Sequence, residues 1–123
     1  AMMQLGNDIF DVYKDRESGI NTLVTLTSHI DEIRSLLKTR LQEYYSAAYE
    51  LGYPEKNTRL FLNILSIAIF SRCFVCLDQL ESNERLTGNQ FIVSAYSRNQ
   101  LICDMDKKIN MLRSAKKHIC EMP

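Results

Sequence analysis

The sequence contains few residues that interrupt helices. Its 123 residues include four glycines, two prolines and no tryptophan. Glycine and proline mark the turns of all-β folds, so their scarcity argues against a sandwich or a barrel. The glycines also divide the chain into stretches as long as helices, whereas strands average about five or six residues. The composition therefore predicts an all-α fold.

The chain also lacks an excess of charge of either sign, because fifteen basic residues balance fifteen acidic ones. Domains that bind nucleic acid through bulk electrostatics carry a clear positive excess, so this mode of binding is not expected. With 46% apolar residues, a chain of this length can bury a core without a disulfide or a metal. We expect a single domain over residues 1–123, with no cofactor. No signal-peptide pattern opens the sequence, which favours a cytoplasmic location.

Apolar residues recur at steps of three and four over the first fifty positions, which is typical of helices. A break is expected near Gly19, because glycine interrupts the pattern there. A stop is expected at Gly52, where glycine can adopt the left-handed conformation that ends a helix. The pattern predicts a short helix at about 7–17 and a long helix at about 20–51.

Two further long helices are predicted at about 57–82 and 89–120, with a loop at Gly88 between them. Fourteen of the eighteen residues in 60–77 are apolar, so this helix is either central or covered by a partner. Arg72 lies inside the run and argues against a membrane span. Short connections make neighbouring helices antiparallel, so the sequence predicts an up-down-up bundle of three long helices plus the short N-terminal one.

The four cysteines suggest a metal or redox site as one alternative. Cys73 and Cys76 form a C-x-x-C pair, and folding the chain as a hairpin brings Cys103 within a turn of Cys73. Cys120 falls at the far end, so at most three thiols can gather, whereas a structural zinc site needs four ligands. Buried free cysteine behaves as a small apolar residue, and we interpret these thiols as core packing.

Familiar catalytic patterns are missing. Neither His29 nor His118 has a glutamate three residues before it, which excludes the di-iron helical bundles. No G-x-S-x-G motif is present, and the isolated glycines cannot form a phosphate-binding loop. The sequence therefore favours a protein without catalytic activity.

One motif supports an alternative. Arg113 and His118 have the form R-x4-H, which resembles the active-site motif of the HEPN family of small helical ribonucleases. The resemblance implies a dimer in which imidazole exchanges a proton with a phosphodiester oxygen while guanidinium steadies the phosphate charge. The other interpretation is a solvated basic helix end, in which Lys116, Lys117 and His118 favour the helix dipole.

Arg72 projects from the most apolar predicted helix. An unpaired buried charge is costly, so a carboxylate is expected within reach. In the hairpin register Asp104 lies one turn from the position that faces Arg72, and Glu32 lies at a similar level. We expect a buried ion pair of Arg72 with Asp104 or Glu32.

One face of the same helix carries Phe70, Cys73 and Leu77, which a solvent-facing stripe would not normally hold together. Tyr45 and Tyr49 share a face near the end of the preceding helix, and tyrosine is favoured at interfaces. These five residues are the candidate interface. The leading hypothesis is a non-enzymatic interaction module: a scaffold, an adaptor or a component of a larger assembly. The expected partner is a protein, and a second copy of the chain is the favoured one.

Overall fold

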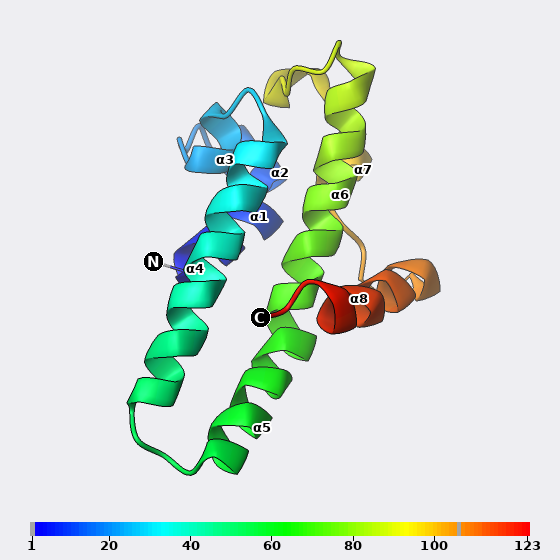
Figure 1. Ribbon diagram of the computed structural model, residues 1–123. Helices are drawn as coiled ribbons and strands as arrows, with labels where there is room; N and C mark the ends of the chain where they lie inside the picture. The colour runs from blue at the N-terminus through cyan, green and yellow to red at the C-terminus, as the bar shows by residue number, and fades with distance from the viewer. Residues whose placement is uncertain (1, 106) are drawn as a thin grey trace.

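The computed structural model describes residues 2–105 and 107–123, and this part of the chain contains helices and loops without strands (Figure 1). The all-α prediction is confirmed. The helical elements are α1 (Met2–Phe10), α2 (Val12–Glu17), α3 (Leu23–Leu26), α4 (Ile30–Glu50), α5 (Glu55–Leu65), the π-helix η1 (Ser66–Phe70), α6 (Ser71–Leu86), the 3-10 helix η2 (Val93–Ala95), α7 (Arg98–Leu101) and α8 (Lys108–Cys120).

An antiparallel hairpin forms the centre of the molecule. α4 runs into a short turn, and α5, η1 and α6 return beside it as one continuous helical rod (Figure 1). Gly52 has a φ of +80° in this turn, a conformation that side chains disfavour, so the predicted helix stop is confirmed. The helix predicted at about 57–82 exists and extends a few residues further at each end.

The helix predicted at about 20–51 is wrong over its first ten residues. The Thr22 side chain accepts a hydrogen bond from the Thr25 backbone N–H, and this capping box begins the four-residue helix α3, which ends at Leu26 before the extended Thr27. α4 begins only at Ile30, whose N–H donates to a Glu84 carboxylate oxygen at 3.0 Å. A residue 54 positions away therefore defines the start of α4, and local periodicity does not contain that information.

The short helix predicted at about 7–17 begins earlier, at Met2, and is divided into α1 and α2 at Asp11. Gly6 lies inside α1, where a Cβ atom would stand 3.5 Å from the Cys73 sulfur of α6. The N-terminal helix is therefore packed closely on the central rod instead of preceding it as a tail.

The continuous helix predicted at 89–120 is wrong, because the chain between α6 and α8 forms only the short helices η2 and α7, and parts of its backbone bond to distant segments. The Phe91 N–H donates to the Ser28 carbonyl at 2.7 Å. Arg16 donates from its guanidinium to the Val93 carbonyl at 3.1 Å. These long-range bonds replace the local ladder that a helix would need.

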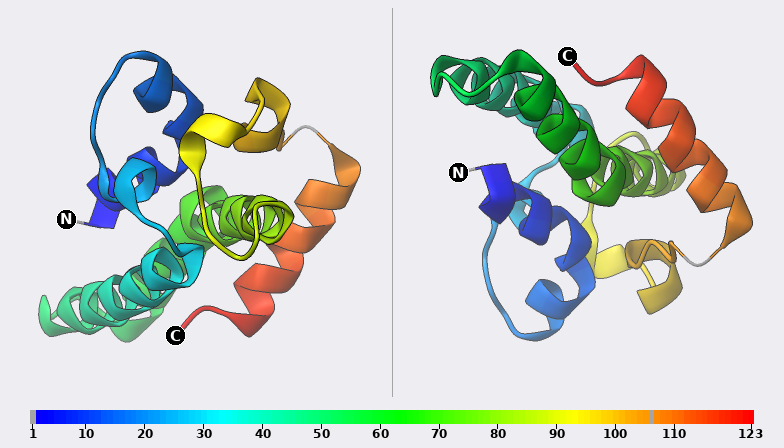
Figure 2. Two further views of the ribbon diagram at one scale, coloured as in Figure 1. Left: turned by 90° about the horizontal axis from the view of Figure 1, so that it is seen from above. Right: turned by 90° about the horizontal axis from the view of Figure 1, so that it is seen from below.

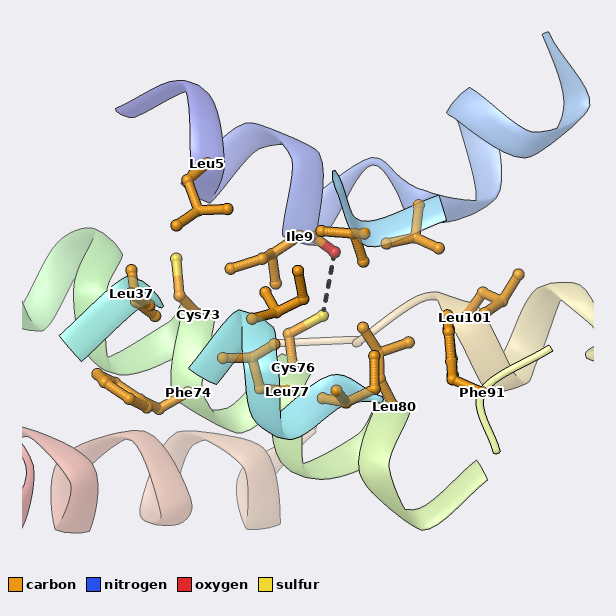
Figure 3. Close-up of a cluster of buried hydrophobic side chains, with 14 of the residues drawn as sticks. Leu5, Ile9, Leu37, Cys73, Phe74, Cys76, Leu77, Leu80, Phe91 and Leu101 are labelled. Carbon is orange, nitrogen blue, oxygen red and sulfur yellow. Dashed lines mark hydrogen bonds between the residues drawn. The ribbon is translucent and has the colours of Figure 1, made fainter. Parts of the chain in front are cut away.

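The core lies between the central rod and the N-terminal helices (Figure 3). Side chains from four different parts of the chain meet in it. Those labelled in Figure 3 are Leu5, Ile9, Leu37, Cys73, Phe74, Cys76, Leu77, Leu80, Phe91 and Leu101. Because α1, α4 and the rod all contribute, folding of the N-terminal segment is coupled to formation of the hairpin.

α8 packs on the side of the hairpin opposite α1–α3 and crosses the rod instead of running antiparallel to it (Figure 2). Two ion pairs attach it: Lys117 lies 3.2 Å from Asp78 of α6, and Lys38 of α4 lies 3.3 Å from Glu121. The third helix of the predicted up-down-up bundle is therefore a crossing helix. Its position leaves the lower half of α5 covered by α4 but not by α8 (Figure 1).

The rod Glu55–Leu86 is long and apolar enough to cross a membrane by length and composition. Half of its most apolar stretch is buried against the rest of the chain. The exposed half belongs mainly to α5 and η1.

Candidate protein-binding groove

A groove of about 300 Å³ lies between the rod and α8. Its lining is mostly apolar, with one arginine and one histidine, and consists of Ile67, Arg72, Met105, Met111, Ser114, Ala115, His118 and Ile119. We call it the η1–α8 groove. Grooves of this size and composition are typical of sites that hold the side chains of a partner or an apolar small molecule.

The apolar surface continues from the groove along α5. Leu60, Ile64 and Ile67 recur at helical spacing and are 61%, 56% and 57% exposed. We call these three residues the outer stripe. The opposite flank of α5 carries Glu55 and Arg59, which form an ion pair with each other. The exposed surface of α5 is thus itself divided into an apolar and a polar half, although its buried side already packs on α4.

α8 contributes the second wall. Its inner side carries Asn110 and Ser114, both buried against the rod. Met111 and Ile119 lie on the groove side and are 58% and 80% exposed. An isoleucine this exposed loses the stabilisation of roughly 1.5 to 3 kcal/mol that burial would give. The two walls therefore present large apolar side chains that the described part of the chain leaves uncovered.

The floor of the groove is fixed by hydrogen bonds around the π-helix. The Ser71 N–H donates to the Ser66 carbonyl, the five-residue step that defines this helix, and the Ser71 hydroxyl donates to the same oxygen at 2.7 Å. The Ser66 hydroxyl lies 2.6 Å from Nδ1 of His118. The π-turn and α8 are therefore joined by one serine, which is fully buried.

Tyr45 of α4 completes this network from the other side. Burial raises the pKa of its phenol, and a hydrogen bond with Ser66 partly opposes the increase. Its ring packs at a tilt on Phe70, with 6.4 Å between the ring centroids. Because Ser66 has no exposed surface, its contact with His118 is structural and offers no nucleophile to a substrate.

The predicted interface is wrong for three of its five residues. Phe70, Cys73 and Leu77 are at most 1% exposed, because α1 and α4 of the same chain cover them. Tyr45 is half-buried as described above, and Tyr49 is 44% exposed. The sequence correctly identified an apolar face that must be buried, but α1 and α4 of the same chain bury it instead of a partner.

The expected buried ion pair is also wrong, because Arg72, Asp104 and Glu32 are all exposed. Arg72 lines the η1–α8 groove instead. The partly buried ion pair between helices is formed by Arg34 of α4, which reaches Asp78 at 2.8 Å and Glu81 at 2.7 Å on α6. Helical spacing placed Arg72 correctly on the rod but could not show which side of the rod has neighbours.

The two residues of the R-x4-H motif line different depressions of one chain. His118 faces the η1–α8 groove, whereas Arg113 borders a second depression on the other flank of α8, together with Lys116 and Lys117. The five-residue spacing separates them around the helix. Within residues 2–105 and 107–123, no group of three or more His, Cys, Asp or Glu side chains is arranged to hold a metal ion.

Sequence reasoning missed the outer stripe, although its residues were part of the apolar run of the rod. The helical spacing of Leu60, Ile64 and Ile67 indicates that they share one face of the helix. It does not indicate which face is exposed, because apolar residues also occupy the face of α5 that packs on α4. Comparison with protein-family models, curated proteins and solved structures finds no match, so only the chain's own geometry bears on function.

Proposed function

We propose that this protein is a helical interaction module whose η1–α8 groove and outer stripe bind an acidic amphipathic helix of a partner protein. The observation that supports it is the exposed apolar surface that spans two helices and includes the positive charge of Arg72. Contiguous apolar surface rimmed by polar groups is typical of protein-interaction sites.

The shape of the surface favours a helix as the occupant. The outer stripe supplies a straight line of apolar side chains along α5, and the groove continues it between η1 and α8. An amphipathic helix places its own apolar side chains three and four residues apart and fits such a groove. An extended strand would leave its backbone hydrogen bonds unmade, because an α-helical surface offers no sheet edge.

The charge of the surface favours an acidic occupant. Lys108 lies three residues before Met111 and so shares the groove side of α8, whereas the arginine and the other lysines of α8 lie on its opposite flank. Among the described residues lining the groove, Arg72 is the one with a permanent charge. Carboxylates on a partner would complement these groups and speed association.

Pairing of the outer stripe with a second copy is less favourable on the same ground. An antiparallel pair centred on Ile64 places Lys56 of one chain opposite Arg72 of the other, since both lie eight positions from the centre. Like charges at an interface cost free energy. Self-association, which the sequence suggested, is therefore the competing outcome of the test.

The test uses two fluorescent synthetic peptides of 20 residues that share a leucine seam, one flanked by glutamate and one by lysine. We expect fluorescence anisotropy to show tighter binding of the glutamate peptide at low salt, weakening as salt increases. Ile67→Asp should reduce its affinity at least tenfold, a loss of about 1.4 kcal/mol. Leu26→Asp, at an exposed position on the remote helix α3, should leave it unchanged.

Charge reversal separates this proposal from general stickiness. Arg72→Glu should shift the preference from the glutamate peptide towards the lysine peptide, because it changes the sign of charge in the groove. Equal binding of both peptides to the unaltered protein, or no effect of Ile67→Asp, would contradict the proposal. A dimer seen by light scattering and dissolved by Ile67→Asp would assign the surface to a second copy instead.

The ribonuclease alternative stays a prediction with its own test. A single chain does not bring Arg113 and His118 to one site, so the alternative requires a dimer that converges the motifs of two chains. If this alternative holds, the unaltered protein cleaves RNA, and His118→Ala abolishes the cleavage while the protein stays folded. Absence of cleavage by the unaltered dimer or monomer would reject it.

A further inference from the structure

α7 and the residue that follows it are held against α6 by two side-chain amides. Gln79 donates to the carbonyl oxygen of Ile102 at 2.9 Å, and Asn83 donates to that of Gln100 at 2.6 Å. Neither acceptor belongs to a neighbouring turn of α6, so these bonds connect residues about twenty positions apart. They fix the backbone immediately before Cys103.

Cys76 lies on the same face of α6, three residues before Gln79. Its thiol donates to the Ile9 carbonyl oxygen at 3.4 Å (Figure 3). The Cys103 thiol donates to the Met105 sulfur at 3.9 Å and lies close enough to Cys76 for the two cysteines to shift each other's pKa. Cys76 is 1% exposed, whereas Cys103 is half-buried and borders two surface depressions. One thiol of the pair is thus accessible to a small reagent, and the other stands directly behind it.

We propose that Cys103 and Cys76 form a redox-sensitive pair, in which a hydroperoxide oxidises Cys103 and Cys76 then closes a disulfide. This inference is independent of the proposed binding function. An accessible thiol beside a resolving thiol is the arrangement found in reversible thiol oxidation.

The chemistry balances with one hydroperoxide as the oxidant. The Cys103 thiolate attacks one peroxide oxygen, the O–O bond breaks, and the departing oxide takes a proton, which leaves Cys103 as a sulfenic acid. The Cys76 sulfur attacks the Cys103 sulfur, its proton passes to the departing hydroxide, and water leaves as the S–S bond forms. In sum, two thiols and one hydrogen peroxide give one disulfide and two waters.

The electrostatic surroundings favour Cys103 as the thiol that reacts first. The neighbouring Cys76 thiol lowers the pKa of Cys103, and the positive charges of Arg113 and Lys107 lower it further, against the opposing effects of burial and Asp104. The pKa of Cys76 is raised well above its usual value by the neighbouring Cys103 thiol and by burial. Only a thiolate reacts rapidly with peroxide, so the accessible thiol is also the activated one.

The remaining cysteines lack this arrangement. Cys73 faces α1, near Gly6, and burial raises its pKa to about 12. Cys120 is exposed at the end of α8 and lies far from the pair along the chain. Both therefore serve as internal comparisons in the test.

The test treats the 123-residue chain with stoichiometric hydrogen peroxide and blocks the remaining thiols with iodoacetamide under denaturing conditions. Mass spectrometry then maps the blocked and the disulfide-linked cysteines. We expect a loss of two hydrogens, with a disulfide-linked pair of peptides containing Cys76 and Cys103. Cys73 should be alkylated, and dithiothreitol should restore all four thiols. In Cys76→Ser, Cys103 should accumulate as a sulfenic acid that dimedone traps.

Three results would overturn the inference. They are a stable sulfinic acid at Cys103 in the unaltered protein, a disulfide between Cys73 and Cys76, or a disulfide-linked dimer through Cys120 as the sole product. Cys120→Ser is the matched control, because its oxidation pattern at Cys76 and Cys103 should equal that of the unaltered protein. The mapping on the unaltered chain decides the matter even if a cysteine variant fails to fold.

Discussion

At the scale of single residues, the partly buried charges of this fold form ion pairs that no short sequence motif predicts. Arg34 is the example: its guanidinium contacts two carboxylates one turn apart on α6. Burial alone would lower its pKa, but the hydrogen bonds to Glu81 and Asp78 outweigh that effect and raise it. Arg34 therefore holds α4 to α6 while remaining charged.

We expect Arg34→Met to lower the free energy of unfolding by about 1 to 3 kcal/mol, because two partly buried carboxylates lose their shared donor. Arg34→Lys should recover part of the loss, since lysine keeps the charge but not the forked geometry. Urea unfolding followed by circular dichroism measures both. Arg40→Met, which removes an exposed pair with Glu43, is the control and should change stability much less.

The buried thiol of Cys73 makes stability depend on alkaline pH. In the unfolded chain the thiol ionises near pH 8.5, whereas burial raises the pKa of Cys73 to about 12 in the fold. The folded state then holds more protons than the unfolded state, so this contribution is complete below the unfolded pKa and is lost as pH rises towards the folded one.

Urea titrations at pH 8 and pH 10 should therefore show lower stability at the higher pH, with a loss of up to about 1.4 kcal/mol per pH unit from this thiol. Cys73→Ala should have a smaller loss between the same two pH values, although its stability at pH 8 is lower because of the cavity. An identical pH dependence in both proteins would refute the assignment.

At the scale of elements, the helix boundaries depend on distant side chains. α4 starts where Glu84 of α6 accepts the Ile30 N–H, and the Glu84 carboxylate also lies 3.6 Å from His29. His29 itself provides no side-chain cap. The sequence predicted the helical face of α4 and its end at Gly52 correctly, because both are local. Its start could not be predicted, because the cap is supplied by the hairpin partner.

Glu84→Ala is expected to destabilise the protein by about 1 to 2 kcal/mol, the usual cost of removing a helix N-cap. Glu84→Gln should lose less, because its amide oxygen can still accept the Ile30 N–H. Thermal unfolding by calorimetry provides the comparison. Glu50→Gln, at an exposed site in the last turn of the same helix, should leave the transition temperature nearly unchanged.

The same reasoning explains the overestimated last helix. The periodicity of α8 was recognised, but the pattern was extended backwards through Phe91 and Tyr96. Their rings are buried and pack together with centroids 5.2 Å apart. Apolar spacing in that stretch reflects packing of a loop on α6 and the N-terminal helices, which mimics a helical repeat without forming one.

At the scale of the whole molecule, the two ends of the rod have different numbers of neighbours. α6 is packed by α1, α4, α7 and α8, whereas α5 packs mainly on α4 and continues into η1. The all-α class and the central hairpin could be predicted, since they follow from composition and connection length. The η1–α8 groove and the outer stripe could not be predicted, because they consist of apolar side chains that remain exposed after the helices have packed.

This asymmetry predicts a gradient of local stability. Amide hydrogens of α5 should exchange with deuterium faster than those of α6, because few tertiary contacts oppose local opening of α5. Mass spectrometry of peptides from 55–65 and 71–86 measures the difference. Addition of the glutamate peptide should slow exchange in α5 and leave α6 unchanged. Equal protection in the free protein would contradict this account of the rod.

The π-helix also has a consequence for the engineering of this chain. A π-turn contains about one residue more than an α-turn, so η1 amounts to a single-residue insertion in an otherwise regular rod. Because the π-turn and the α-turn each complete about one rotation, deleting the exposed Ala68 would give a regular α-helix without rotating α5 relative to α6. The buried Thr58 and Leu62 would keep their register with α4. The rod can therefore gain or lose one residue at this turn while both of its helices keep facing the same neighbours.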